Sequence, residues 1–224
     1  MSKAIYIASS EPNSGKSVIT LGLMNILLGK LRKIAYFKPV IIENSVNNKD
    51  VNIATMIDHF GMGVTYNDCY AFTYPELLKF RSEGNEAYVI DTIITKYKKL
   101  EDTHDFVLVD GMDFEGEGAS FEFSSNVEIA KNLSVPLILV AKCDGFSSDE
   151  VTSKILSTMQ ILRNKEVELL AVIANKLNPL DVDALNEMFA RRLPKSLLTA
   201  IIPYTRELRS PTMKEIVDGV GGKI

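Results

Sequence analysis

The chain has 224 residues, of which 46% are hydrophobic and 24% charged, and its formal net charge is −4. This length and composition are ordinary for a soluble globular protein with one sizeable core. The acidic balance, with an isoelectric point near 5.4, argues against a general nucleic-acid-binding protein, which needs a basic face.

Cysteine content and the N-terminal residues predict a cytoplasmic protein. Cys69 and Cys143 are far apart in sequence and have no metal-ligand spacing, which fits a reducing compartment. The first residues run straight into a polar loop, so no signal peptide is expected. The apolar residues 18–28 are too few to cross a bilayer and are interrupted by Asn25, so no membrane partner is expected.

Residues 5–20, IYIASSEPNSGKSVIT, predict a strand, a phosphate-binding loop and a helix. In such a loop the backbone N–H groups of residues 13–17 and the helix N-terminus surround phosphate oxygens. Lys16 adds a positive charge, and the Ser17 hydroxyl is a ligand for Mg²⁺. The predicted nucleotide-binding residues of the loop are therefore Asn13, Ser14, Gly15, Lys16 and Ser17.

The loop departs from the usual G-x-x-x-x-G-K-[ST] pattern at two positions. Ser10 stands where the first glycine falls, and Pro12 removes one N–H donor. The alternative interpretation is a Gly-Lys-Ser sequence that begins a helix without binding phosphate.

Strands and helices alternate along the rest of the chain. Strands are expected at 5–8, 33–37, 106–109, 136–141, 169–174 and 197–202, and helices at 18–28, 53–60, 86–100, 126–133, 149–163 and 180–192. Polar loops are expected at 42–52 and 112–124, and residues 64–83 show only a turn around Pro75. This alternation predicts an α/β fold of the P-loop NTPase type, a doubly wound, mostly parallel sheet with helices on both faces.

Four polar residues fall at the predicted carboxyl ends of strands, where ligands bind in such folds: Ser10, Lys38, Asp110 and Asn175. Asp110 closes the hydrophobic strand FVLVD. It is expected to hold Mg²⁺, directly or through water, because this ion prefers oxygen ligands. The alternative is a carboxylate that caps the next turn.

Asp50, Lys38 and the Asn175-Lys176 pair have two interpretations each. Asp50 is either a second carboxylate near the metal or a helix-start residue. Lys38 joins Lys16 as a candidate for chemistry on a transferred phosphoryl group, the alternative being an exposed lysine. Asn175-Lys176 ends a predicted strand at the place where a purine base binds in such folds, and the Asn175 amide can both donate and accept hydrogen bonds. The alternative is a simple turn before Pro179.

Two groups of segments carry a family resemblance. ASSEPNSGKS followed by YFKPV resembles the dethiobiotin synthetase group of phosphate-loop proteins. SSNVEIAKNLSVPLILV (124–140), AVIANKLNP (171–179) and IIPYTRELRSPTMKEIVDGVGG (201–222) resemble the N-terminal domain of the long, multidomain phosphate acetyltransferases. The resemblance covers nearly the whole chain and implies one P-loop-type domain over 1–224, with 205–224 a linker into a following domain.

The resemblance also implies a function. Phosphate acetyltransferases interconvert acetyl-CoA plus phosphate with acetyl phosphate plus CoA, and their C-terminal domain carries the acetyl transfer. This chain is therefore expected to lack that activity and to act as a regulatory or stabilising domain. Its implied cofactor is Mg²⁺ with ATP or another nucleotide. The implied partners are a nucleotide or small-molecule effector, the remaining domains of the full-length protein and a second copy of the chain.

Two departures from the synthetase pattern argue against dethiobiotin synthesis. The residues that match are Gly15, Lys16, Ser17, Lys38-Pro39-Val40 and Asp110. Ile41-Ile42 stands where the synthetase has small residues, including a substrate-binding serine, and Met112-Asp113-Phe114-Glu115 replaces its Gly-rich loop. The alternatives to a regulatory domain are an ATP-dependent ligase of the synthetase type and an assembly module whose loop has lost nucleotide binding.

Overall fold

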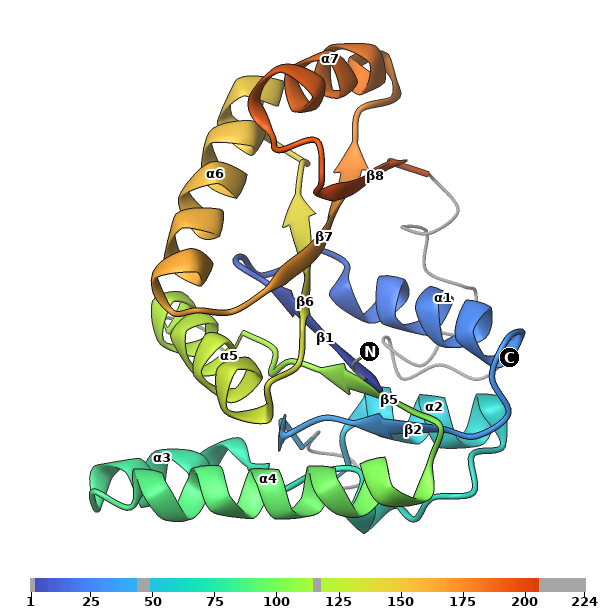
Figure 1. The fold of residues 1–224 in the computed structure, drawn as a ribbon, viewed down its shortest axis with the longest axis vertical. Helices are drawn as coiled ribbons and strands as arrows, with labels where there is room; N and C mark the ends of the chain where they lie inside the picture. Colours follow the sequence, from blue (N-terminus) through green and yellow to red (C-terminus); the bar gives the residue numbers. More distant parts are fainter. Residues whose placement is uncertain (1–2, 44–48, 115–117, 206–224) are drawn as a thin grey trace, which may run out of the picture.

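The computed structural model describes residues 3–43, 49–114 and 118–205, and these form a layered α/β fold (Figure 1). Its centre is a six-stranded sheet in the order β2-β5-β1-β6-β7-β8, in which all neighbouring strands are parallel. The strands are β1 (Ala4–Ser9), β2 (Ile34–Phe37), β5 (Phe106–Asp110), β6 (Leu137–Lys142), β7 (Leu169–Leu177) and β8 (Leu198–Pro203). The prediction of a doubly wound parallel sheet is confirmed.

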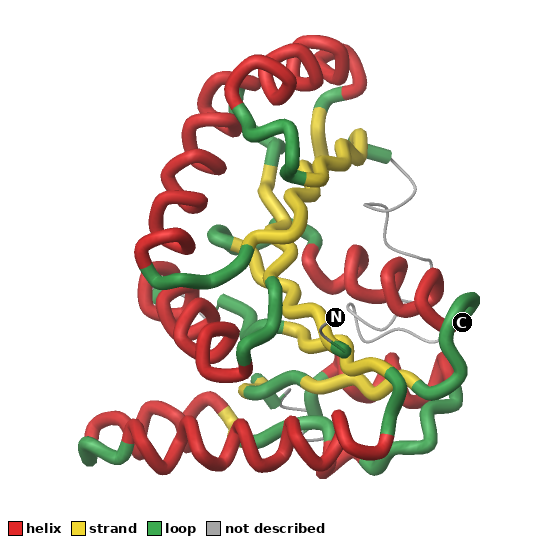
Figure 2. Tube along the Cα trace, in the orientation of Figure 1, coloured by secondary structure: helices red, strands yellow, loops and turns green. Residues whose placement is uncertain are grey.

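Helices cover both faces of the sheet, and Figure 2 shows the strands between the two sets. The helices are α1 (Lys16–Leu28), α2 (Val51–Phe60), α3 (Tyr74–Ser82), α4 (Glu86–Thr103), α5 (Ala119–Leu133), α6 (Ser148–Asn164) and α7 (Val182–Arg192). Side chains alternate along β1 and β2, so Ile7 and Tyr36 pack with α1 and α2. Tyr6 and Phe37 point to the opposite face, where they pack with α3 to α7.

Strand β1 lies at the switch point of the sheet, because its two neighbours are reached by connections in opposite directions. Ile7 of β1 is in register with Asp110 of β5, and Ser9 is in register with Val140 of β6. The residues that follow β1 and β5 therefore leave the sheet side by side. In open α/β sheets this is the place where ligands bind.

The segment 64–83 is more regular than the sequence pattern predicts. It contains a 3₁₀ turn at Tyr66–Asp68, the short strand β4 (Phe72–Thr73) and helix α3. Strand β4 pairs in parallel with β3 (Val40–Ile41) in a separate two-stranded sheet. Pro75 lies in the first turn of α3, where proline is well tolerated, and Thr73 and Glu76 form a capping box before it.

Three predicted boundaries are also wrong. Helix α5 begins at Ala119, so the second half of the predicted loop 112–124 is helical, with Phe123 buried. Strand β7 continues to Leu177, which places Asn175 inside the strand. The first residues of the predicted helix 180–192 belong to a 3₁₀ turn at Pro179–Asp181.

Some predictions fall on residues outside the described parts of the chain. They concern 44–48 in the first polar loop, 115–117 in the second, and 206–224 in the predicted linker. Across the described ranges, the helices are all too short or too polar to pass through a lipid bilayer.

Candidate functional site

The loop between β1 and α1 forms one wall of a cavity of about 550 Å³. Gly15 has φ 84°, and its carbonyl accepts hydrogen bonds from the N–H groups of Val18 and Ile19 at 3.1 and 3.2 Å. Loop residues 11–18 line the cavity together with Asp113 and Phe114 from the segment after β5. A loop that curls into a helix N-terminus beside a cavity is suited to an anion, as the sequence pattern predicts.

Two side chains of β7 donate hydrogen bonds to the backbone of the loop. Asn175 Nδ2 donates to the Ser14 carbonyl at 2.8 Å, and Lys176 Nζ donates to the Asn13 carbonyl at 2.7 Å. Both predicted base-binding residues therefore contact the loop backbone, and their contact with a purine remains a prediction.

Gly15→Ala is expected to lower the free energy of unfolding by about 2–3 kcal/mol. The left-handed backbone is strained by a side chain, and an added Cβ would lie 2.4 Å from Asn175 Nδ2. Asn175 would have to give up its hydrogen bond to the loop. Urea unfolding followed by circular dichroism measures the change.

Gly22→Ala is the matched control. Gly22 lies in α1, and a Cβ added there would meet nothing within 4 Å. It is expected to stabilise α1 by about 0.5–1 kcal/mol. Equal effects of the two substitutions would show that Asn175 does not constrain Gly15.

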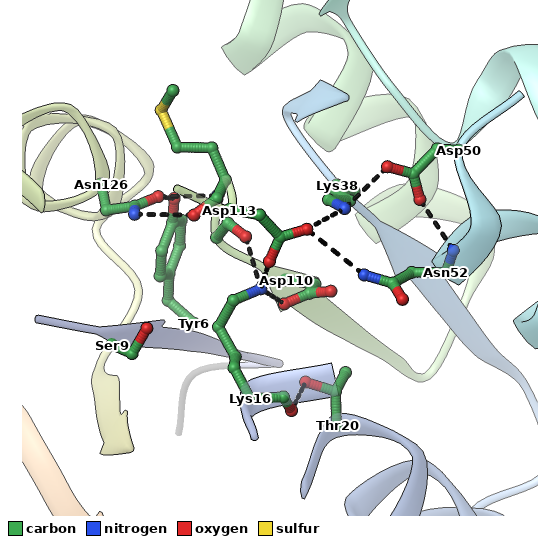
Figure 3. Close-up of polar contacts among 12 residues, drawn as sticks. Tyr6, Ser9, Lys16, Thr20, Lys38, Asp50, Asn52, Asp110, Asp113 and Asn126 are labelled. Atoms are coloured by element: carbon green, nitrogen blue, oxygen red, sulfur yellow. Dashed lines mark hydrogen bonds and ion pairs between the residues drawn. The ribbon is translucent and has the colours of Figure 1, made fainter. Parts of the chain in front are cut away.

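Lys16 points from the first turn of α1 into a group of carboxylates (Figure 3). Its ammonium forms an ion pair with Asp110, lies 3.0 Å from Asp113 Oδ1 and donates to the Gly111 carbonyl at 2.7 Å. The side chain is 4% exposed. An ammonium held by two carboxylates and a carbonyl is fully satisfied without a ligand.

Lys38 is the second lysine of the site and is buried, so its interpretation as an exposed residue is wrong. It is 1% exposed and donates to Asp50 Oδ2 at 2.7 Å and to Asp113 Oδ2 at 2.6 Å. Burial alone would lower the pKa of Lys38, but Asp113, Asp110 and Asp50 outweigh it and raise the pKa above its usual value. Lys38 is therefore a permanent cation at neutral pH.

Asp50 caps a helix, as one of its two interpretations predicts, while its role as a metal ligand stays a prediction. One carboxylate oxygen accepts hydrogen bonds from the N–H groups of Asn52 and Ile53 at 2.9 and 3.1 Å, which caps helix α2. The other oxygen is paired with Lys38. Asp50 therefore fixes the start of α2 to the same cluster as Lys16 and Asp110.

Asp110 is buried at the end of β5 and contacts Lys16 and Tyr36. Tyr36 Oη donates to Asp110 Oδ2 at 2.6 Å, while the other carboxylate oxygen contacts Lys16. Burial and the neighbouring carboxylate raise the pKa of Tyr36, so its hydroxyl remains a donor. These contacts place the Asp110 carboxylate in one charged cluster with Lys16, Lys38, Asp50 and Asp113.

The predicted Mg²⁺ ligands are all oxygen donors: the Ser17 hydroxyl and the carboxylates of Asp50 and Asp110. This donor set fits Mg²⁺, which also keeps waters and takes phosphate oxygens. The described residues contain no group of three or more His, Cys, Asp and Glu side chains that could hold a metal. The binding of Mg²⁺ by these three residues stays a prediction.

Asp113 is the residue of the site that sequence reasoning missed. In the sequence it is part of a departure from the synthetase pattern, and in the structure it bridges Lys16 and Lys38. Burial acts to raise the pKa of Asp113, but the two ammonium groups outweigh it and hold the pKa well below its usual range. An acid three residues after Asp110, in a loop expected to be Gly-rich, was the available signal.

Asn126 of α5 orients the segment that carries Asp113. Its Oδ1 accepts hydrogen bonds from Tyr6 Oη and Met112 N, both at 2.8 Å, and its Nδ2 donates to the Met112 carbonyl at 3.2 Å (Figure 3). The side chain of Asn126 is fully buried. This second residue also escaped prediction, because nothing in the local pattern distinguishes it from a surface asparagine.

The chain is similar in sequence to known proteins of two kinds. The chain is 33% identical over its whole length to the phosphate acetyltransferase of Nitratidesulfovibrio vulgaris, of which it covers 32%. It is 22% identical to an ATP-dependent dethiobiotin synthetase of Haemophilus influenzae, over 79% of this chain and 77% of that protein. The chain thus spans about a third of the length of the acetyltransferases that it matches.

A solved structure and a family model complete the comparison. The ATP complex of McdA from Cyanothece superposes with a TM-score of 0.54 at 14% identity, over 99% of this chain and 97% of that one. It therefore shares the fold. A protein-family model described as an AAA domain matches residues 3–212. The chain belongs to this family of AAA domains.

Proposed function

We propose that the chain is a nucleotide-binding, regulatory or stabilising domain of a phosphate acetyltransferase. The observation that carries the proposal is the full-length match to the acetyltransferase of Nitratidesulfovibrio vulgaris, combined with a phosphate-type loop beside a cavity. The acetyl transfer from acetyl-CoA to phosphate would take place in another part of the longer protein. The chain itself would bind the effector.

The loop supplies the contacts that a nucleotide phosphate needs. The backbone N–H groups of residues 13–17 and the N-terminus of α1 would supply donors to the phosphates, and Lys16 would supply a charge. Ser17, Asp50 and Asp110 would hold Mg²⁺, which would neutralise phosphate charge when bound. Lys16 must then exchange at least one of its carboxylate partners for a phosphate oxygen, so we expect weak binding.

The structure gives two reasons against the synthetase reaction. Ile41 belongs to β3, is fully buried and packs in the core on the α1 side, so its side chain offers a substrate no polar contact. Asp113 brings a negative charge between the two lysines, where an acidic substrate would need them free. A regulatory nucleotide site therefore fits the residues better than a ligase site.

Nucleotide with Mg²⁺ is expected to stabilise the protein against heat. With a dissociation constant in the micromolar to millimolar range, about −8 to −4 kcal/mol, ligand at about 100 times Kd stabilises the folded state by roughly 2.7 kcal/mol. For a chain of this size the melting temperature then rises by about 5–10 °C. Thermal-shift series with ATP, ADP, GTP and GDP, each with and without EDTA, measure the effect.

Ser17→Ala tests the metal part of this proposal, because it removes one ligand and none of the ion pairs of Lys16. We expect nucleotide binding to weaken about tenfold with Mg²⁺, by about 1.4 kcal/mol, and to be unchanged in EDTA. Ser157→Ala on the exposed side of α6 is the control. No shift with any nucleotide at several millimolar would favour an assembly module instead.

The regulatory part needs the longer polypeptide. If the downstream coding sequence continues into an acetyltransferase domain, acetyl phosphate formation by that protein can be assayed with and without nucleotide. We expect nucleotide to change kcat or KM, and Ser17→Ala to weaken the response. An activity that ignores nucleotide while the nucleotide still binds would leave only a stabilising role.

A further inference from the structure

The segment after β5 places one carboxylate on both lysines of the site. Asp113 Oδ1 lies 3.0 Å from Lys16 Nζ, and Asp113 Oδ2 lies 2.6 Å from Lys38 Nζ (Figure 3). Ammonium groups are donors that commonly bind phosphate oxygens, so two of them on one anion resemble the surroundings of a terminal phosphate. The lysines thus already hold an anion that belongs to the protein.

The backbone that leads from β5 to this carboxylate is held by several contacts. Gly111 N donates to the Ile7 carbonyl at 2.8 Å, and a Cβ at Gly111 would lie 2.8 Å from that same oxygen. Met112 is held at both its N–H and its carbonyl by Asn126. The two residues before Asp113 are therefore held in place, and this brings the Asp113 carboxylate within reach of both lysines.

The carboxylate also lines the cavity of the loop. Residues 11–18 and Asp113 line the same space of about 550 Å³, and the Asp113 side chain is 33% exposed. Phosphates bound on the N–H groups of residues 13–17 therefore share this cavity with a negative charge beside Lys16. A third phosphate would bring its own charge against that carboxylate, and like charges in a partly buried site repel strongly.

We infer that Asp113 acts as a built-in anion at the terminal-phosphate end of the site, so that the site binds a nucleoside diphosphate in preference to a triphosphate. The inference rests on the proposed nucleotide function and names the class of ligand for that site. Asp113 is then the residue that determines specificity, while Lys16 and the loop provide affinity.

The test compares diphosphate and triphosphate binding by isothermal titration calorimetry, using ADP against ATP and GDP against GTP, all with Mg²⁺. We expect the wild-type chain to bind the diphosphate at least about tenfold more tightly, which corresponds to about 1.4 kcal/mol. Asp113→Asn keeps the size of the side chain and removes its charge. The preference is expected to fall to about one or to reverse, mainly through tighter triphosphate binding.

Asp91→Asn on the exposed side of α4 is the matched control and is expected to keep the wild-type preference. Equal or tighter triphosphate binding by the wild type would overturn the inference while the proposed nucleotide function stands. A diphosphate preference that survives in Asp113→Asn would also overturn it. Absence of all binding, in the wild type and in the variant, would reject the proposed function and the inference together. If Asp113→Asn fails to fold, Asp113→Ser, which also removes the charge, is titrated in its place and decides in the same way.

Discussion

Lys38→Met is expected to lower the free energy of unfolding by about 3–5 kcal/mol. Methionine keeps the length of the side chain but leaves the carboxylates of Asp50 and Asp113 without the ammonium between them. Asp50 is almost fully buried, so water cannot replace the lost contact. Urea unfolding followed by circular dichroism measures the difference from the wild type.

Lys99→Met is the control, because its ion pair with Asp68 is on the surface, where a pair contributes about 0–1 kcal/mol. The double variant Lys38→Met, Asp113→Asn removes one of the two carboxylates left without the Lys38 ammonium. It should recover part of the lost free energy of unfolding. A double variant whose loss equals the sum of the two single losses would show that Lys38 and Asp113 do not stabilise each other.

The direction of the pH dependence follows from the same contacts. The pKa of Asp113 is lower in the folded state than in the unfolded chain, so its contribution is present above the unfolded pKa and is lost as pH falls. The pKa of Lys38 is raised on folding, so its contribution is present below the unfolded pKa and is lost only in strong alkali. Both contributions are therefore present at neutral pH, and Lys38→Met should flatten the acid side of the stability profile.

Lys16→Met is expected to weaken nucleotide binding by about 100-fold or more, because each hydrogen bond to a charged group contributes about 1.5–3 kcal/mol. In the ligand-free protein Lys16 is held by Asp110, Asp113 and the Gly111 carbonyl. The substitution should therefore also lower the melting temperature without ligand. Calorimetry at a temperature at which circular dichroism shows the variant to be folded separates binding from stability.

Lys30→Met is the control, because Lys30 is exposed just beyond the other end of α1. It should bind nucleotide as the wild type does. If Lys16→Met still bound ATP and ADP with wild-type affinity, the loop would not be the phosphate site, whatever other residues contact the nucleotide.

The sequence predicts those parts of the fold that have a strong local pattern. Three local patterns predict β5, the loop and the parallel sheet: the apolar strand FVLVD, the Gly-Lys-Ser sequence, and the alternation of strand-like and helix-like segments. Helix α3 was missed although Thr73 and Glu76 supply a capping box, because Pro75 was interpreted as a turn. The capping box is a local signal for a helix, and proline in the first turn of a helix is compatible with it.

The site was less predictable, because its contacts join distant strands. The sequence predicts four residues of the site separately, each from its position at the start or end of an element: Lys16, Lys38, Asp50 and Asp110. Their pairing through Asp113, however, depends on the registers of β1, β2 and β5, which no local pattern specifies. The bonds of Asn126 to Tyr6 and Met112 are of the same non-local kind.

The strand order also constrains how the chain can fold during synthesis. Strand β5 lies between β1 and β2, although it follows both in the chain, and Phe106 is in register with Ile34. Until β5 has left the ribosome, β1 and β2 have no shared neighbour, because the pairings at the centre of the sheet are long-range and parallel. In a nascent chain that ends before Phe106, the edges of β1 and β2 that pair with β5 are therefore exposed. The ion pairs of Lys16 and Lys38 with Asp110 and Asp113 can form only after β5 has inserted between these two strands.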